Sequence, residues 1–342
     1  MTHVLKKHFK SSLLAFAILT LVSVIASLTQ GSVDIPTKNI FEILLSRMPL
    51  IGNPFPKHLG PQSTIILEIR LPRIILGLMA GISLSVSGTS MQGVFKNPMA
   101  SPFILGVSAG GAFGAAVGIF FGFPWLLLPL ISFLFAMATT FTVFSLGRVR
   151  GRTDISTLLL AGLAMNFFMT ALTSLILFLS DPVDRMSIVA WTWGSLNGTV
   201  WKEIWIALPV MLIGSAAVYA YARDLNVMQT GETSAKQLGI DVEKTKIVQL
   251  ITASLLAAAV ISFTGVIGFV GLIIPHASRL LVGPDHRKLI PISAFLGGCF
   301  LIWCDTISRM SGEIWVGIIT GLFGAPFFLY LLIKNRGETG WS

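Results

Sequence analysis

Residues 97–147 contain no Asp, Glu, Lys or Arg, a length that would leave a water-soluble domain with almost no charged surface. A helix that crosses a membrane needs about 20 apolar residues, so this stretch is too long for one span. The sequence GIFFGFP at 118–124 divides it into two. Residues 247–278 are also free of these four residue types and are divided by closely spaced glycines. The chain is therefore predicted to cross a membrane repeatedly.

The composition of the whole chain supports this prediction. Of 342 residues, 54% are hydrophobic and 11% are charged, whereas a soluble domain is about 25% charged. This balance excludes disorder and a coiled coil. The net charge of +9 is attributed to loops that set membrane topology, and nucleic acid is not expected as a partner.

The apolar runs predict an all-α polytopic membrane protein with about ten transmembrane helices in one domain, residues 1–342. The predicted spans are Leu13–Leu28, Ile74–Met91, the two halves of 97–147, Ile155–Leu179, Ile204–Tyr221, the two halves of 247–283, Leu289–Cys304 and Ile314–Ile333. The first run is short and follows three lysines, so a signal peptide is the alternative interpretation. No small-residue cleavage site follows it, which favours a retained span.

Basic residues predict the orientation of these helices. With the N terminus in the cytoplasm, fifteen Lys and Arg fall in inside segments and eight in outside segments. The positive-inside rule then favours cytoplasmic N and C termini. Residues 31–62 become an extracytoplasmic loop, 181–202 an extracytoplasmic helix or loop, and 223–246 a polar cytoplasmic region.

The spans carry few groups for chemistry. Asp305 and Arg279 lie towards span ends, whereas ion-coupled carriers usually hold charges at span centres. An ion-coupled secondary transporter is therefore kept only as the alternative class. No nucleophile accompanied by a base suggests a membrane-embedded enzyme, and no phosphate-binding loop suggests ATP binding by this chain. Cys299 and Cys304 are interpreted as buried thiols, and no metal site is predicted.

Two patterns of small residues predict helix packing. Gly77, Gly81, Ser85 and Thr89 share one helical face, which lets a neighbouring backbone approach closely. The segment 98–106 is echoed at 275–283 with Pro, Ala, Ser and Gly in matching places. In the predicted topology the first copy starts inside and the second outside. This parity predicts an inverted repeat that relates helices 2–5 to helices 7–10.

Seven segments in order together resemble one family of transport proteins. They are Ile69–Arg73, Ser87–Ala100, Leu105–Gly111, Gly231–Ile240, Gly265–His276, Gly283–Arg287 and Gly321–Pro326. They are similar to the permeases of FecCD-type ABC importers, which carry vitamin B12, haem and ferric siderophores. The outer loop at 46–62 is longer than the resemblance to that family implies.

The resemblance implies a multi-pass permease of the cytoplasmic membrane that works by alternating access and is not itself an enzyme. It implies a second permease subunit, identical or related, two cytoplasmic ABC ATPase subunits and an extracytoplasmic binding protein. ATP and Mg would be bound by the ATPase, and this chain would hold no cofactor. The expected substrate is a ferric siderophore, with cobalamin or haem as the alternative.

The resemblance also implies three sets of site residues. Arginines at the outer edge would meet glutamates of the binding protein, namely Arg70, Arg73 and Arg309. A cytoplasmic segment would enter a cleft of the ATPase through Glu232, Thr233, Ala235, Leu238 and Gly239. Neutral residues would close the path on the cytoplasmic side at Asn97, Met99, Ser156 and Thr157. The alternative interpretation of this second site is a helix N-cap, for which Asp154 or Ser156 is suitable.

Overall fold

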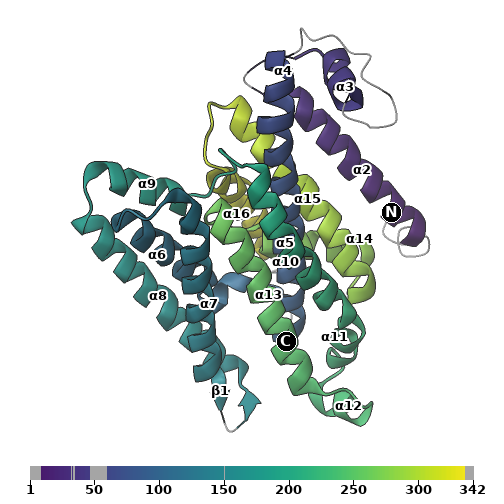
Figure 1. The fold of residues 1–342 in the computed structure, drawn as a ribbon. Helices are drawn as coiled ribbons and strands as arrows, with labels where there is room; N and C mark the ends of the chain where they lie inside the picture. The colour runs from purple at the N-terminus through teal and green to yellow at the C-terminus, as the bar shows by residue number, and fades with distance from the viewer. Residues whose placement is uncertain (1–8, 32, 34, 47–59, 150, 336–342) are drawn as a thin grey trace.

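The structure, a computed structural model, describes residues 9–335 apart from 32, 34, 47–59 and 150. The described chain is an elongated bundle of helices with one short hairpin (Figure 1). The ten principal helices are α2 (Phe9–Thr29), α5 (Leu71–Phe95), α6 (Val107–Phe120), α7 (Leu128–Gly147), α8 (Ile155–Leu179), α10 (Trp201–Ala220), α13 (Val242–Thr264), α14 (Val270–Val282), α15 (His286–Met310) and α16 (Val316–Asn335). Each predicted span coincides with one of them.

Shorter elements mark the two ends of the bundle. At the upper end in Figure 1 lie α3 (Thr37–Ser46) and α4 (Gly60–Thr64), and α9 (Pro182–Thr192) lies at the top of the left-hand group of helices. At the lower end lie α12 (Glu232–Gln237) and a hairpin of β1 (Arg148–Val149) and β2 (Arg152–Thr153). The remaining short helices are η2 (Ile65–Arg70), η3 (Pro102–Leu105), η4 (Trp125–Leu127) and α11 (Ala222–Met228). We call these ends the outer and the cytoplasmic end, following the predicted orientation.

The apolar character of the helices fits a membrane environment, although their lengths differ. Among the described residues, six helices are long and apolar enough to cross a bilayer alone. In contrast, α6 and α14 have 14 and 13 residues. At 1.5 Å per residue each extends only about 20 Å, less than the hydrocarbon thickness. These two helices therefore depend on their neighbours to cover the rest of the depth.

The core forms around α5 and α13, whose residues are largely buried. The first helix of each half packs on the second and third helices of the other half. Thus α5 packs on α14 and α15, while α13 packs on α6 and α7. Helices α5–α8 and α13–α16 thus correspond in order and partners, as the predicted repeat of helices 2–5 and 7–10 requires. The sequence offset was wrong, however. Pro98 lies in a turn after α5, whereas Pro275 lies inside α14, so the two segments are not structural equivalents.

Glycines allow the closest helix contacts in this core. A Cβ atom at Gly81 would lie 2.2 Å from the carbonyl oxygen of Gly297 in α15, and one at Gly88 would lie 1.8 Å from that of Gly271 in α14. Side chains cannot be accommodated at such separations. The small-residue face predicted around Gly81 therefore serves packing within this chain.

The first helix is an integral part of the bundle. It packs on α15, where the hydroxyls of Ser27 and Thr306 are 2.8 Å apart and both are buried. Trp303 donates from Nε1 to the hydroxyl of Ser23 at 3.2 Å. This polar contact between helices favours the retained span over a signal peptide.

Short helices occupy parts of the two predicted outer segments. The region 31–62 includes α3, and most of 46–62 lies outside the described residues. The region 181–202 includes α9, whose first turn is capped by Asp181. Aspartate side chains also cap the N termini of α8, α13 and α15, from Asp154, Asp241 and Asp285. Such caps satisfy the free N–H groups of a first helical turn.

Candidate functional site

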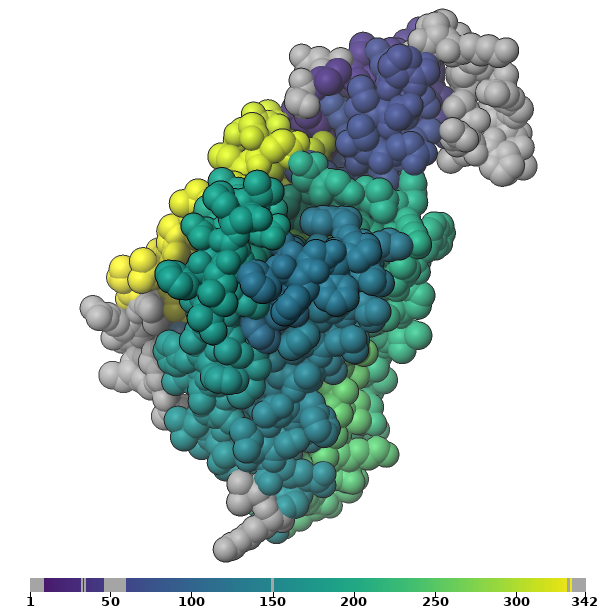
Figure 2. Space-filling model, turned by 60° about the vertical axis from the view of Figure 1, so that its left-hand side comes forward, coloured from purple at the N-terminus to yellow at the C-terminus, as the bar shows by residue number. Residues whose placement is uncertain are grey.

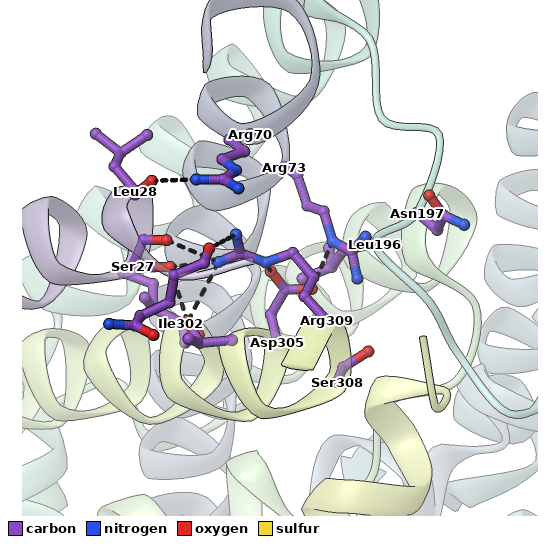
Figure 3. A network of polar contacts seen from close by, with 12 residues as sticks. Ser27, Leu28, Arg70, Arg73, Leu196, Asn197, Ile302, Asp305, Ser308 and Arg309 are labelled. Carbon is purple, nitrogen blue, oxygen red and sulfur yellow. Dashed lines mark hydrogen bonds and ion pairs between the residues drawn. The ribbon is translucent and has the colours of Figure 1, made fainter. Parts of the chain in front are cut away.

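Arg70 lies where a π-helical turn, η2, continues into α5 at the outer end. Its side chain is almost completely buried and faces the end of α2 (Figure 3). Nη1 donates to the carbonyl of Leu28 at 2.7 Å, and Nη2 donates to the carbonyl of Val33. Arg70 therefore ties α5 to the segment that follows α2.

Arg73, one helical turn further on, belongs to a buried ion network with residues of α15. Its Nε donates to Oδ1 of Asp305 at 2.7 Å, and its Nη1 donates to Glu313 at 2.8 Å. Arg309 donates from Nε to Oδ2 of the same aspartate at 3.1 Å. Figure 3 shows the two guanidinium groups converging on Asp305. Both oxygens of this buried carboxylate are thus occupied, which offsets the cost of removing it from water.

Arg309 also binds the first helix. Its Nη2 donates to the hydroxyl of Ser27 at 2.6 Å, and its Nη1 donates to the carbonyl of Gln30 at 2.8 Å. The structure therefore brings the three predicted arginines together at the outer end but turns them inward. Glu313, with its side chain 42% exposed, lies at the solvent side of this network. Sequence reasoning missed the pairing because Asp305 is 232 positions from Arg73.

The predicted cytoplasmic region 223–246 folds as two short helices against the start of α13. Met228 of α11, Ala235 of α12 and Val242 of α13 form a small buried cluster. Thr233 and Gly239 are exposed, and Gly239 adopts a φ of 81° that favours glycine. Leu238 follows α12 with 69% of its surface exposed. The segment therefore exposes an apolar side chain at the cytoplasmic end.

Ion pairs hold α12 in place. The Lys246 Nζ atom lies 2.7 Å from Oε1 of Glu232, the first residue of α12. The hydrogen bond from Lys246 lowers the pKa of the half-exposed Glu232 below its usual value. The carboxylate is therefore charged at neutral pH and fixes the start of α12 on α13.

Further hydrogen bonds join α11 to the core helices. Asn226 donates from Nδ2 to Asp285 at 2.6 Å and accepts from the backbone N–H of His286 at 2.8 Å. Gln229 donates to the carbonyl of Gly93 in α5 at 3.0 Å. The segment that carries Leu238 is thus attached to α5, α13 and α15 rather than suspended as a loop.

The predicted gate residues occupy two places at helix ends. Asn97 accepts from the backbone N–H of Met99 at 2.9 Å in the turn after α5. At the start of α8, Asp154 accepts from the backbone N–H of Thr157 at 2.7 Å, and Ser156 is exposed. No hydrogen bond joins the two pairs of these described residues. The capping alternative therefore applies to Asp154, while Ser156 remains available to solvent.

Two cavities open near the outer end, one of about 370 Å³ between α7, α10 and α13 and one of about 250 Å³ between α7, α9 and α13. They share Glu203, Trp125 and Phe263 in their lining. Their walls are mostly apolar, and sequence reasoning did not single them out. Figure 2 views the side of the molecule formed by the blue and teal segments of α6–α9, with yellow α16 at its left edge.

Comparison with known proteins gives concordant results. The model of the FecCD transport family matches residues 19–334. The cobalamin import system permease protein BtuC of Halobacterium salinarum is 48% identical over 81% of this chain and 76% of its own length. The iron(3+)-hydroxamate import system permease protein FhuG of Bacillus subtilis is 37% identical over 82% of this chain and 87% of its own length.

A solved structure agrees over nearly the whole fold. It is that of a metal-chelate type ABC transporter in an inward-facing conformation, 32% identical to this chain. The superposition has a TM-score of 0.83 and covers 95% of this chain and 99% of the other.

Proposed function

The chain belongs to the FecCD transport family, and we propose that it forms the path by which a ferric siderophore crosses the cytoplasmic membrane. The family consists of permease subunits of ABC importers, which are multi-pass proteins of that membrane. Such subunits are not enzymes, and ATP is handled by a partner ATPase. A binding protein is the other partner implied by this type of importer.

One observation carries the proposed coupling to ATP. A short folded segment at the cytoplasmic end presents the exposed Leu238, and it is anchored to three core helices. A segment anchored in this way can pass a displacement from an ATPase to the bundle. We therefore propose that Glu232, Thr233, Ala235, Leu238 and Gly239 form the contact with two ATPase subunits, one on each permease of a dimer.

The state of Asp305 argues against an ion-coupled carrier. Such a carrier needs a buried acid that can take up and release its ion. Asp305 is buried, but both of its oxygens accept hydrogen bonds from arginines. It is therefore a fixed member of an ion network, which supports an energy source outside the chain.

The roles of the outer arginines and the gate residues remain proposals. At the outer end, Arg70, Arg73 and Arg309 would set the charge and shape of the surface that receives the binding protein. At the cytoplasmic end, Asn97, Met99, Ser156 and Thr157 would narrow the path between two permease copies. The neutral side chains in this set suit a bulky solute that must pass without being held.

The substrate is proposed from the family and its members. A ferric siderophore is the first expectation, supported by the similarity to an iron(3+)-hydroxamate permease. Cobalamin is the second candidate, because a relative that is 48% identical is named for cobalamin. Both are bulky metal complexes. Haem is a further alternative substrate.

The test begins with the tagged chain purified from its native membrane, where an ABC ATPase should co-purify in equal amount. Uptake is then measured in intact cells that carry or lack the chain. Iron-55 ferrichrome and cobalt-57 cyanocobalamin serve as separate probes. Uptake of either that stops when ATP is depleted supports the function and identifies the substrate class. Uptake that instead follows the proton gradient, without an ATPase, would overturn it.

A further inference from the structure

Lys246 is the buried lysine among the described residues, with 3% of its surface exposed in the first turns of α13. Its Nζ atom lies 2.7 Å from Glu232 and 3.7 Å from Glu243. Burial of an ammonium group is costly unless it is paired, so these two carboxylates are required neighbours. One of them belongs to α12, the proposed ATPase contact, and the other to α13.

Glu243 extends the connection to a third element. Its Oε2 atom accepts a hydrogen bond from the backbone N–H of Thr153 at 2.9 Å, at the end of the β1–β2 hairpin. The next residue, Asp154, caps α8 by accepting from the backbone N–H of Thr157. A continuous series of polar contacts therefore runs from the start of α12 to the start of α8.

The helix at the end of this series, α8, lies at the edge of the bundle and packs on α6, α7 and η3. Only 11% of its most apolar 18-residue window is buried within the chain. Its first residues include Ser156 and Thr157, the proposed gate. Helix α13, in contrast, is 67% buried and forms part of the core. A displacement at α12 would thus be resisted by α13 and expressed at the start of α8.

We propose that Lys246 is a positioning residue that transmits movement of α12 to the gate at the start of α8, through Glu243 and the β1–β2 hairpin. This inference rests on the proposed function and adds a route between two of its sites. The route combines a close ion pair at 2.7 Å, a longer one at 3.7 Å and a hydrogen bond to a carboxylate at 2.9 Å, and contacts to charged groups of this kind are directional. They transmit a displacement better than the loose packing of an exposed loop.

The experiment uses Ser156→Cys as a reporter in the full chain with its ATPase. In inside-out vesicles the labelling rate with an impermeant maleimide is compared without nucleotide and with ATP and vanadate. Cys299 and Cys304 are buried and should label slowly. We expect nucleotide to change the Ser156→Cys rate at least threefold, and Lys246→Met to remove that change while ATP hydrolysis continues.

Matched variants separate transmission from folding. Lys244→Met removes an exposed lysine of the same helix and should keep the nucleotide response. Lys246→Arg keeps the charge and should restore at least half of it. If Lys246→Met fails to fold, Glu243→Gln carries the same test, since it weakens the link to Thr153 from a partly exposed position.

The outcomes are distinct. A full nucleotide response in folded Lys246→Met or Glu243→Gln would overturn the inference, with the proposed function intact. Absence of ATPase and of ATP-dependent uptake in the unaltered chain would instead reject the proposed function. Loss of the response in Lys246→Met, with Lys244→Met unaffected and Lys246→Arg restoring it, would support the route.

Discussion

Arg73 donates a hydrogen bond from Nε to Oδ1 of Asp305 at 2.7 Å, and this contact joins the first turn of α5 to the last turns of α15. The same two helices are in close backbone contact at Gly81 and Gly297. One pair of helices is thus held by an ion pair at its outer end and by backbone contact further along. The outer network therefore stabilises the fold, whatever it contributes to docking.

Replacement of Asp305 by asparagine should destabilise the protein. It would leave the buried Arg73 and Arg309 facing a neutral group, and loss of one partner from a buried ion pair costs about 3–5 kcal/mol. Thermal unfolding in detergent should show a clear fall in Tm. The molecules that fold should still drive uptake with ATP. Normal stability together with abolished uptake would instead indicate an ion-carrying role for Asp305.

Glu313→Gln should increase the affinity for the binding protein. Glu313 lies 2.8 Å from Arg73 and is half-exposed, so its negative charge offsets the positive charge that this buried arginine would present to a carboxylate at the surface. The gain should be largest at low salt, since exposed charges are screened as ionic strength rises. The affinity is measured by titrating the detergent-solubilised permease with its binding protein at several salt concentrations. Equal affinities for the variant and the unaltered chain would remove Arg73 from the docking surface.

The helices were predictable because length and hydropathy decide whether a segment spans a membrane. All ten predicted spans coincide with helices. They include the short α6, which precedes the break at 118–124, and the short α14, which follows the glycines of 265–271. Which residues correspond within the repeat was not predictable from the sequence. Pro98 and Pro275 are the same residue type, but they differ in local structure. Four identities in nine positions contain too little information to fix a register.

The direction of the arginines could not be read from the sequence. Local composition placed Arg70 and Arg73 at the outer edge, but their partners are distant in the chain and come from α2 and α15. Lys246 presents the same difficulty, since it looks like any lysine of a cytoplasmic loop. Only the packing of α12 on α13 shows that it is buried between two glutamates.

The ion pair at α12 should weaken in acid. Because Lys246 lowers the pKa of Glu232 from its usual 4.5, the pair contributes its full stability above about pH 4.5 and loses it as pH falls through the lower folded value. Hydrogen exchange of the amides of α12 should accelerate over that range. Glu232→Gln should exchange fast at neutral pH and show less dependence on pH. An identical pH profile in that variant would contradict the assignment.

Gly88→Val should destabilise the core without touching a proposed site. Its Cβ would meet the carbonyl oxygen of Gly271 at 1.8 Å, so α5 and α14 would have to separate. Overpacking of this kind costs about 1–3 kcal/mol or more. The control is Gly321→Ala in α16, where nothing lies within 4 Å of the added carbon. If both variants unfold at the same temperature as the unaltered chain, the close contact is not essential.

Leu238→Glu should detach the ATPase from the permease and so abolish transport. The side chain is 69% exposed and contributes little to folding, so the variant should reach the membrane in normal amount. A charge at an apolar contact would be buried without a partner when the ATPase binds, which costs several kcal/mol. ATPase recovery with the tagged chain should fall at least tenfold, and uptake should fall with it. Leu238→Met conserves volume and should retain both. Normal ATPase recovery with Leu238→Glu would move the contact to another part of the cytoplasmic end.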